Sequence, residues 1–209
     1  MLDRVPSEPE DDSPLKRFMT ADEFAARRMD FPEGGRWVEL HEGFPVLLQA
    51  PDDAHGNVVL NISREFAVWF QAQGAASPDY AGYDLGLHVS TDPDTIYFPA
   101  ISCFNKGPRF EQNDLLIASQ RPHLVVDIAS SNDRRRDMRL RTLAYLKMGV
   151  ETIWIPDPFK REVQVVRKNQ TTVSLGDWQI LEGGQALPGF SLAVKTIFAQ
   201  PSWWTGTKR

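Results

Sequence analysis

Apolar residues recur in two patterns along the chain, and together they predict a protein with few helices and many short strands. Residues 56–73 carry apolar side chains three and four positions apart, which is typical of an amphipathic helix. Thr20 and Glu23 have the spacing of a capping box, which predicts a short helix near the start. The other apolar runs are short and end at turn residues, as strands do. The predicted strands cover residues 37–40, 46–48, 80–89, 99–104, 124–126, 152–155, 162–166 and 171–181. Within the last of these, Gly176-Asp177 can form a turn.

One strand–helix–strand unit organises the chain. The run 124–126 is short and β-branched, as a buried strand is. A polar turn follows it and leads into a helix predicted over 132–148. The next apolar strand, 152–155, is expected to lie parallel beside the first, joined by a right-handed crossover. The pattern as a whole predicts one α/β domain with a mixed β-sheet flanked by helices.

A carboxylate ends the first strand of this unit. Asp127 follows the strand directly, and α/β proteins tend to place ligand chemistry at that end of a strand. Ser131 or Asn132 can cap the helix that follows, and Gly149 is expected to end it. Two interpretations of Asp127 stay open at this point. It is either a ligand-binding acid or a residue that caps the helix or terminates the strand.

Composition and charge mainly exclude classes of protein. The chain has 209 residues, of which 42% are hydrophobic and 24% charged, as in ordinary soluble domains. The net charge of −5 means that nucleic acid would need a local basic patch. The single cysteine, Cys103, excludes an intrachain disulfide and a cysteine zinc site. No apolar run approaches the roughly 18 residues of a membrane span, and no signal peptide is recognisable, so we expect a cytoplasmic location.

The two ends of the chain differ from its middle. Residues 1–14 are acidic and almost free of apolar side chains, so we expect a disordered tail. The domain itself is expected to cover residues 15–199. The tail 200–209 contains Trp203 and Trp204, which we expect to dock on this subunit or on a neighbouring one in a homodimer.

Several other polar residues are candidates for function, each with a plainer alternative. Glu39 lies within a predicted strand and needs either a partner or a solvated face. His55 stands at the start of the long helix, where a lone histidine is usually structural or solvated. Arginines crowd the start of helix 132–148, where they could contact phosphates or simply pair with acids on a solvated face. They are Arg134, Arg135, Arg136, Arg139 and Arg141.

Short motifs occur in a fixed order between residues 18 and 198. They are Met19-Thr-Ala-Asp-Glu-Phe, Trp37-Val-Glu-Leu-His-Glu-Gly, Pro93-Asp-Thr-Ile-Tyr-Phe-Pro-Ala, Pro122-His-Leu-Val-Val-Asp-Ile-Ala-Ser, Trp154-Ile-Pro-Asp-Pro and Leu187-Pro-Gly-Phe. Taken in this order, they resemble the Uma-two-like restriction endonucleases, a branch of the PD-(D/E)XK nuclease superfamily.

The resemblance implies a restriction-endonuclease-like fold with a metal-dependent phosphodiesterase site. In such a site two acids hold a hard ion such as Mg²⁺, which stabilises the phosphate and helps to generate hydroxide. A lysine orients or activates the water. The family pattern places these three groups at Ala100, Asp127 and Arg141 of this chain. Other positions match the pattern and are implied to support the site. They are Glu39, His55, Ser130, Asp137 and Tyr145.

The chain departs from the family pattern at the three central positions. The methyl group of Ala100 cannot coordinate a metal, and Asp127 is one methylene shorter than the glutamate expected there. Arg141 keeps the positive charge of lysine, but its proton is not available near neutral pH. We therefore expect a vestigial catalytic site of Asp127, Arg141 and Glu39, in which Mg²⁺ binding at Asp127 is weak or absent.

These departures lead to one main expectation and two alternatives. The main expectation is an impaired or inactive nuclease that retains nucleic-acid binding through its arginines and needs no cofactor. The first alternative is an active Mg²⁺-dependent DNA endonuclease that uses a replacement acid among Glu39, Asp94 and Asp127. The second is a non-catalytic homo-oligomeric interaction module closed by Trp203 and Trp204.

Overall fold

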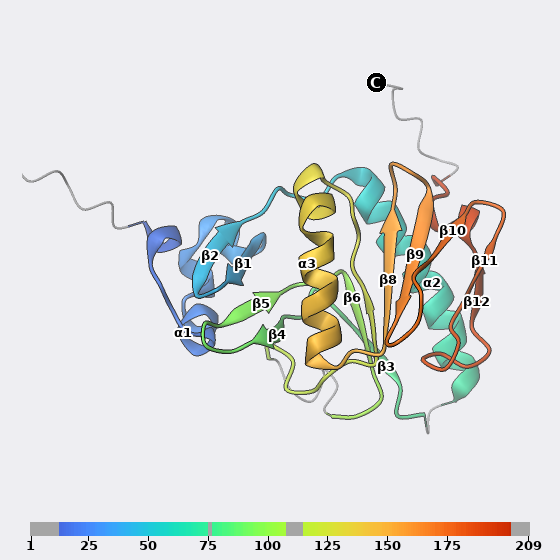
Figure 1. Ribbon diagram of the computed structural model, residues 1–209, viewed down its shortest axis with the longest axis horizontal. Helices are drawn as coiled ribbons and strands as arrows, with labels where there is room; N and C mark the ends of the chain where they lie inside the picture. Colours follow the sequence, from blue (N-terminus) through green and yellow to red (C-terminus); the bar gives the residue numbers. More distant parts are fainter. Residues whose placement is uncertain (1–12, 75–76, 108–114, 202–209) are drawn as a thin grey trace, which may run out of the picture.

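The structure, a computed structural model, describes residues 13–74, 77–107 and 115–201 and contains a large mixed sheet between two helices (Figure 1). The sheet has six strands in the order β10-β9-β8-β7-β6-β3. Only the pair β7 and β8 is parallel, and its neighbours are antiparallel. The strands are β3 (Tyr80–Tyr83), β6 (Ile101–Phe104), β7 (Leu124–Val126), β8 (Thr152–Asp157), β9 (Glu162–Arg167) and β10 (Val173–Gly176).

The side-chain alternation of these strands produces two separate cores. Successive residues of a strand point to opposite faces, so Leu124 and Val126 face one helix while Val125 faces the other. Helix α2 (Asp53–Gln73) packs Ile62 and Phe66 on the first face. Helix α3 (Asn132–Met148) covers the second face. Burial on both faces explains why β7 is apolar throughout, in contrast to the alternating pattern of a half-exposed strand.

A smaller sheet and the N-terminal helices form a third core beside the large sheet (Figure 1). This sheet has the strand order β2-β1-β5-β4 and is antiparallel. Phe24, Leu40 and Ile96 lie fully buried in its core. Its elements are η1 (Pro14–Lys16), α1 (Ala21–Ala26), η2 (Arg28–Asp30), η3 (Pro32–Gly35), β1 (Val38–His41), β2 (Phe44–Leu47), β4 (Leu87–Ser90) and β5 (Thr95–Tyr97).

The predicted strand–helix–strand unit is confirmed, with its helix ends as expected. Ser131 caps α3, because its side-chain oxygen accepts a hydrogen bond from the amide of Arg134 at 3.1 Å. Gly149 ends the helix in the left-handed conformation, with φ of 98°. The capping box of α1 is also present, with Thr20 as its N-cap. Asp127 takes no part in capping α3, so its side chain is left for other contacts.

Some predicted boundaries are wrong, and turns explain them. The run 80–89 is two strands, because the chain turns at Asp84, whose φ is 47°, and passes from the large sheet to the small one. The run 171–181 is also two strands, because the turn that the sequence allows at Gly176-Asp177 does form, closed by a hydrogen bond between Gly176 and Gln179. Its second half, β11 (Ile180–Glu182), pairs with β12 (Ser191–Ala193) in a separate two-stranded sheet.

Two helix predictions also need correction. The long helix α2 begins at Asp53, three residues earlier than predicted, because Asp52 caps it by accepting the amide of His55 at 2.9 Å. His55 therefore lies inside the first helical turn. The sequence predicts that a final short helix or turn begins at Ile197-Phe198. The structure instead has helix α4 (Val194–Ile197), which ends where the predicted one begins.

The α/β fold class is confirmed, although the strands divide among three sheets instead of one. Within the part of the chain that the structure describes, no helix is long and apolar enough to cross a membrane. The prediction of a disordered tail covers residues 1–14, of which 1–12 lie outside the described residues, while Pro14 begins η1. The prediction about Trp203 and Trp204 also concerns residues outside the described ones.

Candidate active site

Two buried carboxylates from different sheets meet at one guanidinium. Glu39 comes from β1 of the small sheet, and Asp127 follows β7 of the large sheet. Arg141, from the third turn of α3, lies between them. The Nε atom of Arg141 donates to Asp127 Oδ2 at 2.6 Å. Its Nη1 and Nη2 atoms donate to the two oxygens of Glu39 at 2.5 and 3.0 Å, so this pair is bidentate. We call this set of Glu39, Asp127 and Arg141 the arginine clasp.

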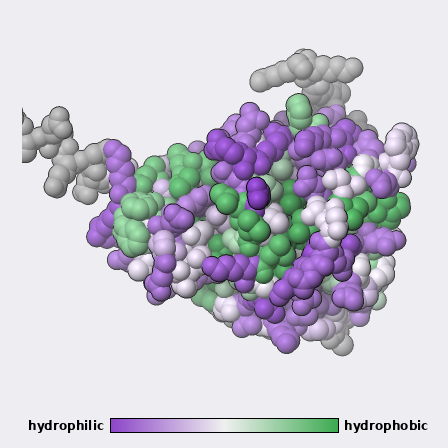
Figure 2. Space-filling model, viewed as in Figure 1, coloured by the Kyte–Doolittle hydropathy of each residue, from purple (hydrophilic) through white to green (hydrophobic). Residues whose placement is uncertain are grey.

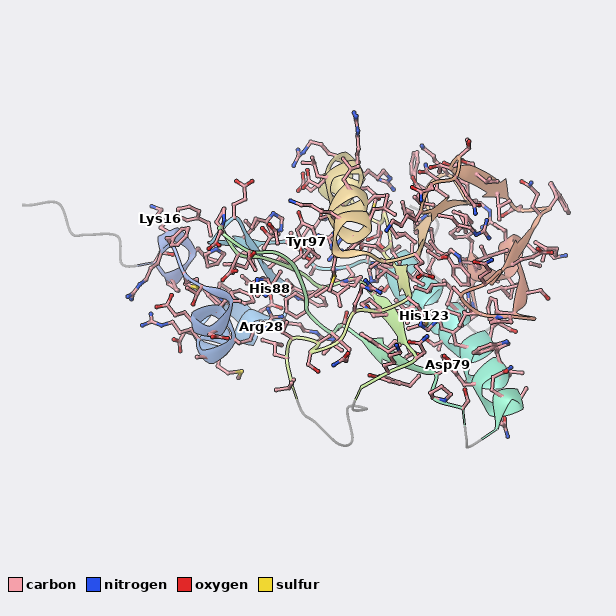
Figure 3. All side chains as sticks on the ribbon, turned by 60° about the horizontal axis from the view of Figure 1, so that its bottom comes forward. Lys16, Arg28, Asp79, His88, Tyr97 and His123 are labelled. Carbon is pink, nitrogen blue, oxygen red and sulfur yellow. The ribbon has the colours of Figure 1, made fainter. Side chains whose placement is uncertain are left out.

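The helical spacing of residues on α3 places Arg141 on the buried face of the helix. Met138, Arg141 and Tyr145 are spaced three and four residues apart and form the buried face of the helix. The hydroxyl of Tyr145 donates to Asp127 Oδ2 at 2.8 Å and accepts from Arg141 Nη2 at 3.2 Å. The guanidinium of Arg141 also lies 4.3 Å from the ring centre of Tyr97. In Figure 3 Tyr97 lies between the N-terminal strands and α3.

The oxygens of Glu39 and Asp127 also have hydrogen-bond partners other than Arg141 and Tyr145. Asp127 Oδ1 accepts from Arg134 Nη1 at 3.0 Å. Glu39 Oε1 accepts from the backbone amide of Phe98 at 2.8 Å, and His41 Nε2 lies 3.0 Å from Glu39 Oε2. Every oxygen of Glu39 and Asp127 therefore has at least one donor within hydrogen-bond distance, which is what burial of two charges requires.

Burial and charge oppose each other at Glu39. Glu39 is 1% exposed and Asp127 is fully buried. Burial alone would raise the pKa of Glu39, but Arg141, His41 and Arg134 outweigh it and hold that pKa well below its ordinary value. Burial would likewise lower the pKa of Arg141, but Asp127 and Glu39 raise it well above its ordinary value. The site is thus a balanced set of two anions and two cations.

The residues present do not fit a magnesium ion. Mg²⁺ needs carboxylate oxygens that are free to coordinate it, and guanidinium groups hold those of Glu39 and Asp127. Ala100, at the position of the lost acid, is 4% exposed and packs into the apolar core. Among the described residues no group of three or more histidine, cysteine, aspartate or glutamate side chains could hold a metal. A pocket of about 20 Å³ reaches Arg141 between His41 and Asp137, which is about the space of one water molecule.

His55 and Ser130 form a second, smaller contact beside the clasp. The Nδ1 atom of His55 lies 2.9 Å from Ser130 Oγ. Burial lowers the pKa of His55 to about 4, and the positive charge of Arg134 adds to this, while Asp127 and Asp52 oppose it. His55 is therefore neutral at pH 7 and helps to place the loop that carries Asp127, because Ser130 lies between that acid and the helix cap.

A further acid, which the sequence reasoning missed, lies beside the lost one. The amide of Asp84 donates to the carbonyl of Ala100 at 3.4 Å, so the two residues are neighbours across β3 and β6. Partial burial raises the pKa of Asp84, and Arg36, Arg134 and Arg28 act against it. Three guanidiniums thus act on the carboxylate of Asp84. No local pattern marks Asp84, because its approach to Ala100 depends on strand pairing.

Asp94, one of the proposed replacement acids, is used elsewhere. Its Oδ1 lies 2.8 Å from His88 Nε2, and its Oδ2 accepts the amide of Ala21 at 2.7 Å. It therefore ties the start of β5 to helix α1, at the opposite end of β5 from Phe98 and the clasp. Figure 3 shows His88 in this N-terminal part of the molecule.

The arginines that begin α3 point in different directions. Arg134 faces the clasp, whereas Arg135 pairs with Asp157 at 3.3 Å on the other side of the helix. Arg136 is exposed and pairs with Asp133 at 3.1 Å and Asp137 at 3.3 Å. Arg139 is exposed on the side of Arg135. Residues one position apart on a helix differ by about 100°, so this run of arginines divides among several surfaces.

A family model matches residues 21–195, which include the whole clasp. The family is Uma2, whose description is "Putative restriction endonuclease". The chain belongs to this family. Among the curated proteins none matches this chain. A solved structure with the same fold is that of a "putative nuclease belonging to DUF820" from Anabaena variabilis, with a TM-score of 0.68 and 22% sequence identity. The similarity covers 86% of this chain and 97% of that one.

Removing the guanidinium from the clasp tests how much of the stability depends on it. In Arg141→Met two carboxylates stay buried without their shared partner, so we expect a loss of about 3–5 kcal/mol in the free energy of unfolding. Arg139→Met, two residues earlier on the exposed side, should change it by less than about 0.5 kcal/mol. Denaturant unfolding measures both. The combination Glu39→Gln, Asp127→Asn and Arg141→Met should recover part of the loss, and equal stability of the two single variants would contradict the assignment.

The low pKa of His55 predicts a dependence of stability on pH. Between pH 6.5 and about 4 the unfolded chain binds a proton at this residue and the folded chain does not. Stability should therefore fall as the pH falls through this window, by at most about 3 kcal/mol from His55. The measurement is the difference in unfolding free energy between the natural chain and His55→Gln as a function of pH. A constant difference from pH 7 to 4, or an NMR titration midpoint of His55 near 6.5, would contradict the prediction.

Proposed function

We propose that this member of the family is a nuclease-fold protein that binds nucleic acid beside the arginine clasp, at a cleft bordered by Arg28, Arg36 and Arg134. It does not cut nucleic acid by the metal-dependent route. The observation that carries the proposal is the position of Arg141, which holds both buried carboxylates of the site. A cation-binding site needs the same oxygens, so metal and clasp are mutually exclusive uses of these groups.

Charge balance supports the loss of metal chemistry. A divalent ion between acids supplies two positive charges that stabilise a phosphate and lower the pKa of bound water. Here Arg134 and Arg141 supply two positive charges to Glu39 and Asp127, but neither guanidinium can bind and ionise water as a metal does. The two arginines therefore replace the positive charge of a metal ion, but they do not replace its ability to activate water.

The arginines around Asp84 support the binding half of the proposal. Arg28, Arg36 and Arg134 all act on its carboxyl group, so three cations lie near this one acid. The guanidinium of Arg28 lies 4.2 Å from the ring centre of Phe98, and that of Arg36 lies 4.8 Å from the ring centre of Trp37. Arginines stacked on aromatic rings beside a groove are a common means of binding nucleic-acid phosphates and bases.

The two alternatives receive less support from the contacts. An active nuclease would need a third oxygen donor near Glu39 and Asp127. Asp94 is bound to His88 and Ala21 instead. Asp84 neighbours Ala100, but the charges of Arg36, Arg134 and Arg28 act on its carboxyl group. An oligomeric module would depend on Trp203 and Trp204, which lie outside the described residues.

A cleavage assay tests the catalytic half of the proposal. Incubated with plasmid or single-stranded DNA and Mg²⁺ or Mn²⁺, the protein should produce no cleavage above a buffer control, because guanidinium groups hold the oxygens of Glu39 and Asp127. Cleavage that disappears in both Asp127→Asn and Asp127→Ala would contradict the proposal. As a positive arm, Ala100→Asp with Asp127→Glu and Arg141→Lys should gain Mg²⁺ binding in calorimetry, since it restores the donor set that the family pattern has.

A salt titration tests the binding half. With a fluorescent oligonucleotide, affinity should fall as the salt concentration rises, and Arg36→Ala should reduce the slope of log K against log[salt] by about one. Arg136→Ala is the matched control, because Arg136 is exposed but neutralised by Asp133 and Asp137. Equal losses in the two variants, or no salt-dependent binding, would contradict a cleft-centred interface.

A further inference from the structure

A groove with an apolar floor runs beside α3, away from the clasp. On this face of the six-stranded sheet, α3 packs together with residues of β4 and β5. Among the described residues no other helix covers this face, and strands β9 and β10 extend past α3 (Figure 1). The groove has a volume of about 500 Å³. Its floor is apolar and includes Leu143, which is 54% exposed. The apolar floor residues are Met138, Leu143, Leu146, Ile155 and Val166.

The rim of the groove is cationic. Four basic side chains line it, from the helix on one side and from the strands and turns on the other. Asp157 is the acid among the lining residues and is paired with Arg135, and Lys160 is paired with Glu162 at 3.5 Å. Among the described residues, Arg139 and Arg167 are therefore the rim cations without an ion pair. Figure 2 shows apolar surface near the centre of this face with hydrophilic residues around it. The four basic residues are Arg135, Arg139, Lys160 and Arg167.

These charges favour one kind of occupant over others. Two copies of this groove placed face to face would bring cationic rims together, which opposes a symmetric dimer through it. The phosphates of a nucleic acid could pair with the cationic rim. The exposed side chain of Leu143 on the floor would then lack an apolar partner. An acidic segment with some apolar side chains satisfies both parts. Such a segment is present in this chain, because residues 1–12 contain five acids, one arginine, and the apolar Met1, Leu2 and Val5.

We propose that residues 1–12 of the chain bind in the groove between α3 and strands β8 and β9. The acids would pair with the cationic rim, and Leu2 and Val5 would contact the apolar floor. The segment is long enough, since 12 extended residues span about 40 Å. A domain of this size has a radius of gyration of about 16 Å. The proposal is independent of the clasp and of nucleic-acid binding at the cleft.

A spin label on the segment tests the proposal in the full chain. Ser7→Cys provides the attachment point, because the natural Cys103 is buried and burial raises the pKa of its thiol. We expect the methyl NMR signals of Leu143 and Ile155 to lose most of their intensity in the labelled chain. The signals of Leu60 and Val68, exposed on α2, should keep theirs. Loss of intensity on both faces alike, or on neither, would overturn the proposal.

Charge variants and a mixing experiment make the test specific. Arg139→Glu with Arg167→Glu should restore the signal of Leu143, whereas Arg64→Glu, an exposed change on α2, should not. Broadening that persists in the double variant would overturn the proposal. So would equal broadening when labelled chains are mixed with isotope-enriched unlabelled ones, which would assign the groove to a second copy. If an oligonucleotide changes the chemical shift of Leu143 and the spin label does not broaden this signal, the groove binds nucleic acid. That result would also overturn the proposal.

Discussion

The contact on which this structure depends is the guanidinium of Arg141 between Glu39 and Asp127. These carboxylates belong to different sheets, so the arginine joins the small N-terminal sheet to the large one through α3. All three groups are buried, and none could be buried alone without a large desolvation cost. Their mutual neutralisation, completed by Arg134 and Tyr145, lets the two sheets and the helix approach so closely.

The same contact decides what chemistry the site can perform. In a metal-dependent nuclease, acids are kept in place while their oxygens remain available to an ion. In this chain the acids are held by donors that occupy those oxygens, and the neighbouring position carries the methyl group of Ala100. The family resemblance implies a lysine where this chain has Arg141, and the arginine makes contacts of its own with both acids. A planar fork of donors bridges two carboxylates at once, which an ammonium group cannot do in the same way.

The charged residues of helix α3 lie on different faces of the helix and contact different partners. Arg141 and Arg134 lie on the face toward the clasp, Arg136 lies among acids on the outer surface, and Arg135 and Arg139 border the groove. The leucines at 140 and 143 are exposed while Arg141 is buried, which reverses the usual arrangement of an amphipathic helix. This reversal reflects a helix whose inner face contacts a polar site and whose outer face exposes two leucine side chains.

Local patterns in the sequence determined the secondary structure of the central unit. The run 124–126, the cap at Ser131 and the stop at Gly149 each act over a few residues, so they could be recognised without a structure. Failures occurred where a turn interrupts an apolar run, as at Asp84, because the next strand joins another sheet. The family motifs likewise indicated Glu39, Asp127 and Arg141 as members of one site.

Only the tertiary structure decided which of these residues are buried and which of them contact one another. Glu39 and Arg141 are 102 positions apart, and nothing in the local sequence distinguishes a buried bidentate pair from two solvated charges. The approach of Asp84 to Ala100 depends on the pairing of β3 with β6, and the separation of Arg134 from Arg135 depends on which face of α3 packs on the sheet. Residue types and spacing are properties of the chain itself, whereas burial and the choice of partner arise only when distant segments pack together.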